Sequence, residues 1–277
     1  MIRSFVSLII VFVFTCTAFL FYGIRIPSSK NSSNPPARFS HTQFDAVLRQ
    51  VVSERGQVNY QLLLQRESAL DQYLGQIAAV SPETHPSLFA DQNSRMVYWI
   101  NAYNAFVLKG VLRYYPTSGV LETLPLHGFF WALRFNAGGE YMSLYHLENG
   151  ILRKRFNEPR IHFAINCASA GCPALAPYAF VAEKLDQQLK MGTEAFIKDE
   201  LNVRFDEASG IAYLSKIFSW YQEDFQTEPV AGRQTPLAYI IPFLNVEQRR
   251  KFSLRQNWEI QYLGYDWRLN QTHFEQE

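Results

Sequence analysis

Residues 159–175 read PRIHFAINCASAGCPAL, and the other segments of the chain can be arranged around this stretch. The apolar residues from Ile161 to Ile165 predict a short buried strand, and the small residues that follow predict a loop. His162, Cys167 and Cys172 all fall within it. A strand that runs into a loop gives reactive side chains a rigid support and an open approach. The stretch is therefore the candidate functional site, although a buried strand followed by a disulfide-closed turn has the same pattern.

The composition indicates a globular chain with ample material for a core. The 277 residues carry a formal net charge of +1 and are 48% hydrophobic. Such a balance, without clustered lysine and arginine, argues against nucleic-acid binding. The sequence has no glycine-rich phosphate loop, and the C-x-x-x-x-C spacing of its one pair of neighbouring cysteines is not usual for zinc. We therefore expect no nucleic-acid partner, no metal and no cofactor.

An uncharged run from residue 4 to 24 lies between Arg3 and Arg25. As a helix, it would be about 30 Å long, which matches the hydrocarbon core of a bilayer. A cleaved signal peptide would have a shorter apolar core and a small-x-small site, which residues 19–22 do not supply. We expect a retained signal anchor over residues 1–26.

The anchor sets the expected domain organisation and location. Residues 27–38 are rich in serine, asparagine and proline and predict a flexible linker. Residues 39–277 would form one globular domain. With no second apolar run after the anchor, we expect a single-pass protein of the cytoplasmic membrane whose globular domain is periplasmic or extracytoplasmic.

Helical periodicity dominates the globular part, and short alternating segments add a few strands. Helices are predicted over residues 40–55, 62–74, 95–114, 141–153, 185–196, 217–225 and 236–244. Strands are predicted over residues 161–165, 203–205, 211–213 and 258–263. We expect an α+β fold, a helix-rich single domain around a small, mostly antiparallel sheet, with an N-terminal transmembrane helix.

Two asparagines occupy the most apolar predicted helix, residues 95–114. Asn101 and Asn104 lie one turn apart, and a buried amide without a partner costs about 1–3 kcal/mol. Either they bind neighbouring backbone groups, or they orient a catalytic group or a substrate.

Several motifs, in order along the chain, resemble the DUF547 family of uncharacterised domains. They are GQVNY (56–60), WINAYNA (99–105), Ser143-Leu144 through Glu148 to Ile151-Leu152-Arg153, RIHFA (160–164), NCAS (166–169), Cys172-Pro173, LSKIF (214–218), Trp220-Tyr221, Asp224-Phe225 and YDWRLN (265–270). The resemblance covers roughly residues 39–270 and implies a shared fold and site, but it names no reaction. Many members have a histidine directly after the glutamate that corresponds to Glu148, where this chain has Asn149.

A buried helix followed by a strand that carries a histidine is also similar, at the level of fold, to transglutaminase and papain-like proteins. In those proteins the catalytic cysteine begins the central helix. Here the corresponding helix has Trp99 and Asn101 near its start and no cysteine. That catalytic arrangement therefore does not carry over directly.

Cysteine with histidine suggests nucleophilic catalysis, in which an imidazole activates a thiol. In a continued strand, His162 and Cys167 would stand about 16 Å apart, so partners from other segments are easier. The expected catalytic residues are His162 as general base and Cys167 as nucleophile, with Glu148 and Asn101. His162 also fits a hydrogen-bonded core histidine, and Glu148 fits an ordinary ion pair.

The polar residues beside these candidates are Asn104, Asn166 and Ser169, which we expect to bind substrate. Cys167 and Cys172 have three open interpretations: a disulfide, a catalytic thiol at Cys167 with Cys172 resolving or structural, or inert buried thiols. The aromatic residues Trp220, Tyr221 and Phe225 are at helical spacing and fit a core.

Two functional hypotheses follow. The first is a thiol- or histidine-dependent hydrolase or transferase that acts on an amide or ester of an envelope polymer or protein. The second is a non-catalytic binding module for such a partner, with a structural Cys167–Cys172 disulfide. A redox role would require an exposed, reducible pair.

Overall fold

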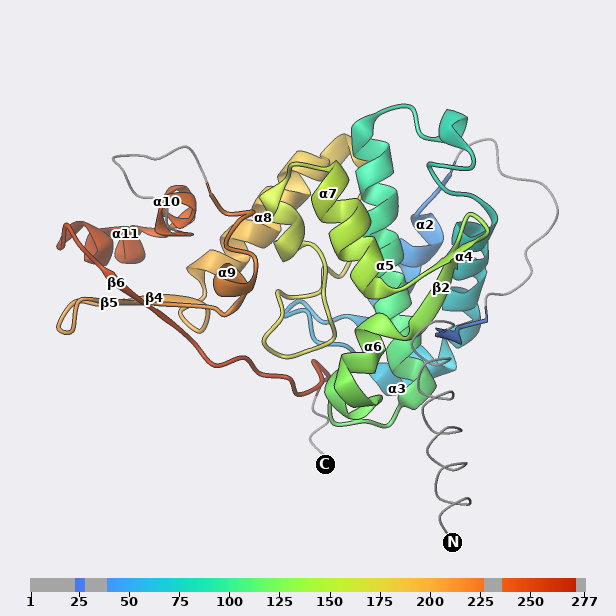
Figure 1. Ribbon diagram of the computed structural model, residues 1–277, viewed down its shortest axis with the longest axis horizontal. Coiled ribbons are helices and arrows are strands. Elements are labelled where there is room, and N and C mark those ends of the chain that lie inside the picture. Colours follow the sequence, from blue (N-terminus) through green and yellow to red (C-terminus); the bar gives the residue numbers. More distant parts are fainter. Residues whose placement is uncertain (1–22, 28–38, 227–235, 273–277) are drawn as a thin grey trace, which may run out of the picture.

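The computed structural model describes residues 23–27, 39–226 and 236–272. Helix α5, Gln92–Tyr114, runs through the larger part of the fold (Figure 1). Nearly every side of it is buried, as its sequence predicts. It begins at Gln92 because the Asp91 carboxylate accepts a hydrogen bond from the backbone N–H of Ser94 at 2.7 Å, which caps the first turn.

The N-terminal half surrounds α5 with helices and one small sheet. Its elements are β1 (Ile24–Arg25), α2 (Thr42–Val51), α3 (Tyr60–Gln65), α4 (Glu67–Ala79), α6 (Gly128–Trp131), β2 (Leu133–Ala137) and β3 (Glu140–Met142). In this sheet, β2 pairs antiparallel with β3 and parallel with β1. The largest hydrophobic cluster of the described chain gathers around α5 and includes residues from α2, α4 and β2.

The C-terminal half supplies a second sheet and a second, smaller cluster. Its elements are a π-helix (His146–Leu152), α7 (Arg153–Arg155), a 3-10 helix (Pro159–Phe163), α8 (Leu185–Lys198), β4 (Val203–Asp206), β5 (Ile211–Leu214), α9 (Ile217–Trp220), α10 (Pro236–Ile240), α11 (Val246–Ser253) and β6 (Glu259–Tyr262). The sheet lies at the opposite end of the molecule from β2 (Figure 1). Phe163, Phe196 and Phe218 are part of the second cluster.

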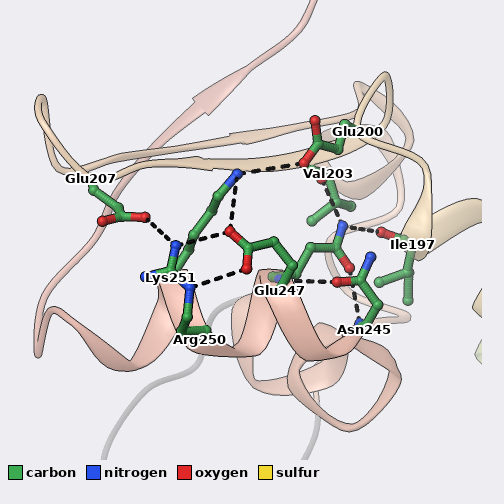
Figure 2. Close-up of polar contacts among 9 residues, drawn as sticks. Ile197, Glu200, Val203, Glu207, Asn245, Glu247, Arg250 and Lys251 are labelled. Atoms are coloured by element: carbon green, nitrogen blue, oxygen red, sulfur yellow. Dashed lines mark hydrogen bonds and ion pairs between the residues drawn. The ribbon is translucent and has the colours of Figure 1, made fainter.

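Helix α11 is held against β4 by the packing of Phe252 on Phe205 and by one buried amide. Gln248 Nε2 donates to the carbonyl oxygens of Ile197 and Val203 at 2.8 and 3.0 Å. Figure 2 shows these acceptors beside the surface contacts of Glu247, Arg250 and Lys251. Those ion pairs are exposed and contribute little, whereas an unpaired buried amide would be costly.

The fold is mixed helix and strand, as predicted, but the sheet is not one mostly antiparallel unit. There are two three-stranded sheets in the described chain, each with one parallel and one antiparallel pairing. The predicted hairpin is confirmed as β4–β5, and its third strand, β6, returns parallel to β5. Sequence alternation detects strands but carries no information about which strand pairs with which.

One local prediction was wrong, and two others had wrong boundaries. The 161–165 segment is not a strand: residues 159–163 form a 3-10 helix, which Pro159 can begin and which the Glu158 carboxylate caps by accepting from Arg160 N. The 141–153 helix is confirmed apart from its start: residues 141–142 belong to β3, and residues 144–155 are helical with the π-helix in the middle. The 217–225 helix ends at Trp220, and the turns that follow place Asp224 beside Arg153.

The predicted transmembrane segment lies outside the described residues up to position 22. None of the helices in the described ranges is both long and apolar enough to cross a bilayer. The last residues of the predicted anchor are described, and they make an unexpected contact: Ile24 pairs with Leu133, and Ile26 is buried in the main hydrophobic cluster. The chain therefore joins the first sheet before residues 28–38.

Candidate functional site

A cavity of about 450 Å³ lies where the two hydrophobic clusters meet. Ile165, from the larger cluster, and Ile217, from the smaller one, both line it. Its remaining wall is aromatic and polar and comes from α5, α6, the π-helix, the cysteine loop, α9 and the segment after β6. The cavity is thus assembled from residues far apart in sequence.

His162 lies in this wall and is held by a carboxylate. Its Nε2 is 2.7 Å from Asp224 Oδ2, and the residue is 4% exposed. Because an ionised carboxylate only accepts hydrogen bonds, Nε2 carries the proton and Nδ1 is the basic nitrogen. The 3-10 turn also removes the separation predicted for an extended strand, since His162 and Cys167 line the same cavity.

Asp224 is the central residue that the sequence analysis missed. Arg153 binds it through two hydrogen bonds, Nε to Oδ2 at 2.5 Å and Nη2 to Oδ1 at 2.9 Å. Burial raises the pKa of Asp224, but the hydrogen bonds from His162 and Arg153 outweigh burial and hold the pKa well below its usual range. Its place in the Asp224-Phe225 motif was a signal, but spacing alone did not connect it to residue 162.

Glu148 is brought to the site, with tyrosines rather than an arginine as partners. The Tyr221 hydroxyl donates to Oε1 at 2.5 Å and the Tyr103 hydroxyl to Oε2 at 3.1 Å. Burial, and next the charge of Glu148, raise the pKa of both tyrosines, so both hydroxyls remain donors. The Tyr221 ring stacks on His162 with 4.0 Å between centroids. Glu148, Tyr221 and His162 therefore form one packed unit.

Cys167 and Cys172 form a disulfide in the cavity wall. The Tyr265 hydroxyl donates to Cys172 Sγ at 3.0 Å, and the backbone N–H of Cys167 lies 3.0 Å from the same sulfur. Both cysteines are half-buried. In this state neither sulfur is a thiol, so Cys167 has no nucleophile to offer.

The predicted asparagines and Ser169 support the loops and are not among the described residues that line the cavity. Asn101 exchanges two hydrogen bonds with the backbone of Phe180. Asn104 donates to Ala164 O and accepts from Asn166 N, both at 2.9 Å.

Asn166 and Ser169 hold the cysteine loop. Asn166 donates to Pro173 O at 2.7 Å, and Asn166 Oδ1 accepts from Asn270 Nδ2 at 3.1 Å. Ser169 is 1% exposed and pairs with Leu269. The side chains of Asn101 and Asn104 thus bind backbone groups, which is one of the two interpretations left open by the sequence.

Two aromatic groups face the cavity. Trp220, Tyr265 and Trp267 form the first, with centroid distances of 4.5 to 5.7 Å. Trp131 and Tyr145 form the second, stacked at 3.7 Å. Trp220, which was predicted to be core, is 44% exposed.

No three metal-ligating side chains converge in the described chain.

Residues 87–197 match the family model described as "Protein of unknown function, DUF547". This segment belongs to the DUF547 family. No curated protein and no solved structure matches the chain at a significant level. The DUF547 segment contains Glu148, Arg153, His162 and both cysteines, while Asp224, Trp220 and Tyr265 lie beyond it.

Asn149, at the position where the family resemblance led us to expect a histidine, is part of the cavity wall. Here Asn149 accepts a hydrogen bond from Arg153 Nη1 at 2.5 Å and donates to the carbonyl of Tyr145. It thereby braces Arg153 against Asp224. An amide does not titrate, so this position supplies neither an acid nor a base in this chain.

Proposed function

We propose that this chain is a membrane-anchored, extracytoplasmic binding module, and that its cavity holds a ligand of the cell envelope between the two aromatic groups. The single observation that carries the proposal is the pair of partly exposed aromatic walls around a polar floor. Trp131 and Trp220 are 48% and 44% exposed, which is unusual for side chains of that size. Flat apolar surfaces beside fixed polar groups are typical of ligand sites.

The polar floor supports a ligand that carries hydrogen-bonding groups. His162 and Glu148 have their orientations fixed by Asp224 and by two tyrosines, so little ordering is needed on binding. A sugar ring or a peptide offers both an apolar face and polar edges. An envelope polymer built from such units fits this combination.

The uncharged run at residues 4–24 supports the proposed location. Its length suits one membrane crossing, and the disulfide suits an oxidising compartment outside the cytoplasm.

A second candidate function is histidine-dependent hydrolysis or group transfer at an amide or ester. It is favoured by the Asp224–His162 pair. A basic Nδ1 would take a proton from water or from an acceptor hydroxyl as the new bond to the carbonyl carbon forms, while Asp224 stabilises the imidazolium. The imidazolium would then return that proton to the leaving amine or alcohol as its bond to the carbonyl carbon breaks. A thiol-dependent version requires prior two-electron reduction of the disulfide by a dithiol.

Binding of soluble muropeptides and N-acetylglucosamine oligomers to the full chain in nanodiscs, measured by calorimetry, tests the proposal. Trp220→Ala should weaken binding by about tenfold or more, because tryptophans at the centre of a site carry a large share of the binding energy. Trp258→Phe is the control, since Trp258 packs against Phe205 of β4 and Phe252 of α11, away from the cavity.

Equal affinity for wild type and Trp220→Ala would remove the aromatic-wall proposal. Turnover of a bound probe that disappears in His162→Gln, with binding retained, would favour the hydrolase.

A further inference from the structure

Residues 123–133, between α5 and β2, read TLPLHGFFWAL and contain no Lys, Arg, Asp or Glu. Leu126 is 89% exposed, and Trp131 is 48% exposed. Leu126 and His127 both have positive φ, 55° and 60°, a backbone conformation that costs non-glycine residues about 1–2 kcal/mol. The backbone is therefore strained at a position where an apolar side chain is exposed to solvent. An exposed apolar side chain on a strained loop is typical of a surface that binds another molecule or a membrane.

The start of the described chain lies against this segment. Ile24 N donates to Ala132 O at 2.7 Å, and Ile24 is paired with Leu133. Gly23 also packs closely against Ala132, since a Cβ at position 23 would lie 2.5 Å from Ala132 O. Both Gly23 and Ile24 belong to the uncharged run, so Trp131 is held within roughly 10 Å of the end of that run.

Arginine and tyrosine side chains border the apolar segment. Arg25 and Arg134 are partners in the parallel pairing of β1 with β2. The Arg25 guanidinium lies 4.6 Å above the ring of Tyr141, which is 40% exposed. Within the described ranges, neither arginine makes an ion pair. Trp, Tyr and Arg side chains of this kind are enriched where proteins meet lipid headgroups.

We propose that Leu126, Trp131, Tyr141 and Tyr145, with Arg25 and Arg134, form a surface that rests on the lipid bilayer. The inference depends on the anchor in the proposed function and adds to it. The end of the anchor is held in the first sheet, and this surface adds lipid contacts that fix the orientation of the domain on the membrane.

Orientation on the membrane has a consequence for the ligand. Trp131 and Tyr145 belong both to the proposed surface and to the cavity wall. The mouth of the cavity beside them therefore opens at the headgroup layer. Its ligand is then one that the membrane presents, such as an amphiphile with a polar head.

The test places an environment-sensitive nitrobenzoxadiazole dye at a single free cysteine, with Cys167 and Cys172 kept in their disulfide. The full chain carries Cys16→Ser and is reconstituted in vesicles of phosphatidylethanolamine and phosphatidylglycerol. Leu126→Cys reports on the proposed surface. Leu201→Cys is the matched control, because Leu201 is 80% exposed and lies between α8 and β4 in the second half. Both sites are exposed, so neither change should disturb folding.

We expect the dye at position 126 to emit at shorter wavelength and to be quenched by spin-labelled lipid, and the dye at position 201 to remain water-like. Water-like emission at both positions, in chains that resist extraction by alkaline carbonate, would overturn the proposed surface and leave the anchor intact. Chains that carbonate extracts from the vesicles would overturn the anchor and the surface together.

Discussion

At the scale of single residues, Asp224 connects the two halves of the site. It accepts from His162 and from Arg153, and its side chain is 24% exposed. The variant Asp224→Asn removes the carboxylate charge and leaves Arg153 without a charged partner. We expect a loss of about 1–3 kcal/mol in the free energy of unfolding, measured by urea denaturation at neutral pH.

The same variant gives a pH test. The pKa of Asp224 is depressed in the folded state, so its stabilising contribution is complete above the unfolded value of about 3.9 and is lost as the pH falls towards the folded value. The stability difference between wild type and Asp224→Asn should therefore shrink as the pH drops below about 4. A difference that grows on acidification would contradict the assignment of the ionised carboxylate.

At the scale of elements, the position of His162 depends on how closely α8 approaches the 3-10 helix. A Cβ at Gly192 would lie 2.9 Å from Phe163 O, a backbone atom that cannot move alone. Gly192→Ala should therefore cost about 1–3 kcal/mol of stability through overpacking. Gly264→Ala is the control, because its added Cβ meets nothing within 4 Å. Equal melting temperatures for the two variants would argue against this tight contact.

The cysteine loop is a second element with a measurable contribution. The disulfide closes a short loop, with a sequence separation of 5, for which loop entropy predicts roughly 2 kcal/mol. We expect the double variant Cys167→Ser with Cys172→Ser to lose about that amount in denaturant titrations. If the double variant is as stable as wild type, the bond does not hold the loop.

The elements that were predicted well from the sequence are those whose pattern lies within a few neighbouring residues. The buried face of α5, the amphipathic α8 and the β4–β5 hairpin follow from periodicity and turn residues alone. The segment around His162 was wrong because an apolar run of five residues fits a buried strand and a 3-10 turn equally well.

The site was only partly predictable for a related reason. His162, Glu148 and the two cysteines were selected from their chemistry, and in the structure all four line the same cavity. Asp224 and Tyr221 meet Arg153, His162 and Glu148 only through tertiary contacts across more than sixty positions of sequence. Such contacts leave no spacing pattern in a single sequence.

At the scale of the whole molecule, the proposed envelope protein combines a ligand-binding cavity with a closed pair of cysteines. The oxidised pair is compatible with ligand binding but not with thiol catalysis, because a disulfide cannot supply the attacking thiolate. Only Cys16 would then be available to an alkylating reagent, since the chain has 3 cysteines.

Alkylation of the full chain, isolated without reductant from the oxidising compartment and mapped by mass spectrometry, tests this most directly. We predict that Cys167 and Cys172 resist alkylation and are recovered as one linked peptide pair. Rapid alkylation of Cys167 in the native protein would contradict the account and restore the thiol-dependent enzyme.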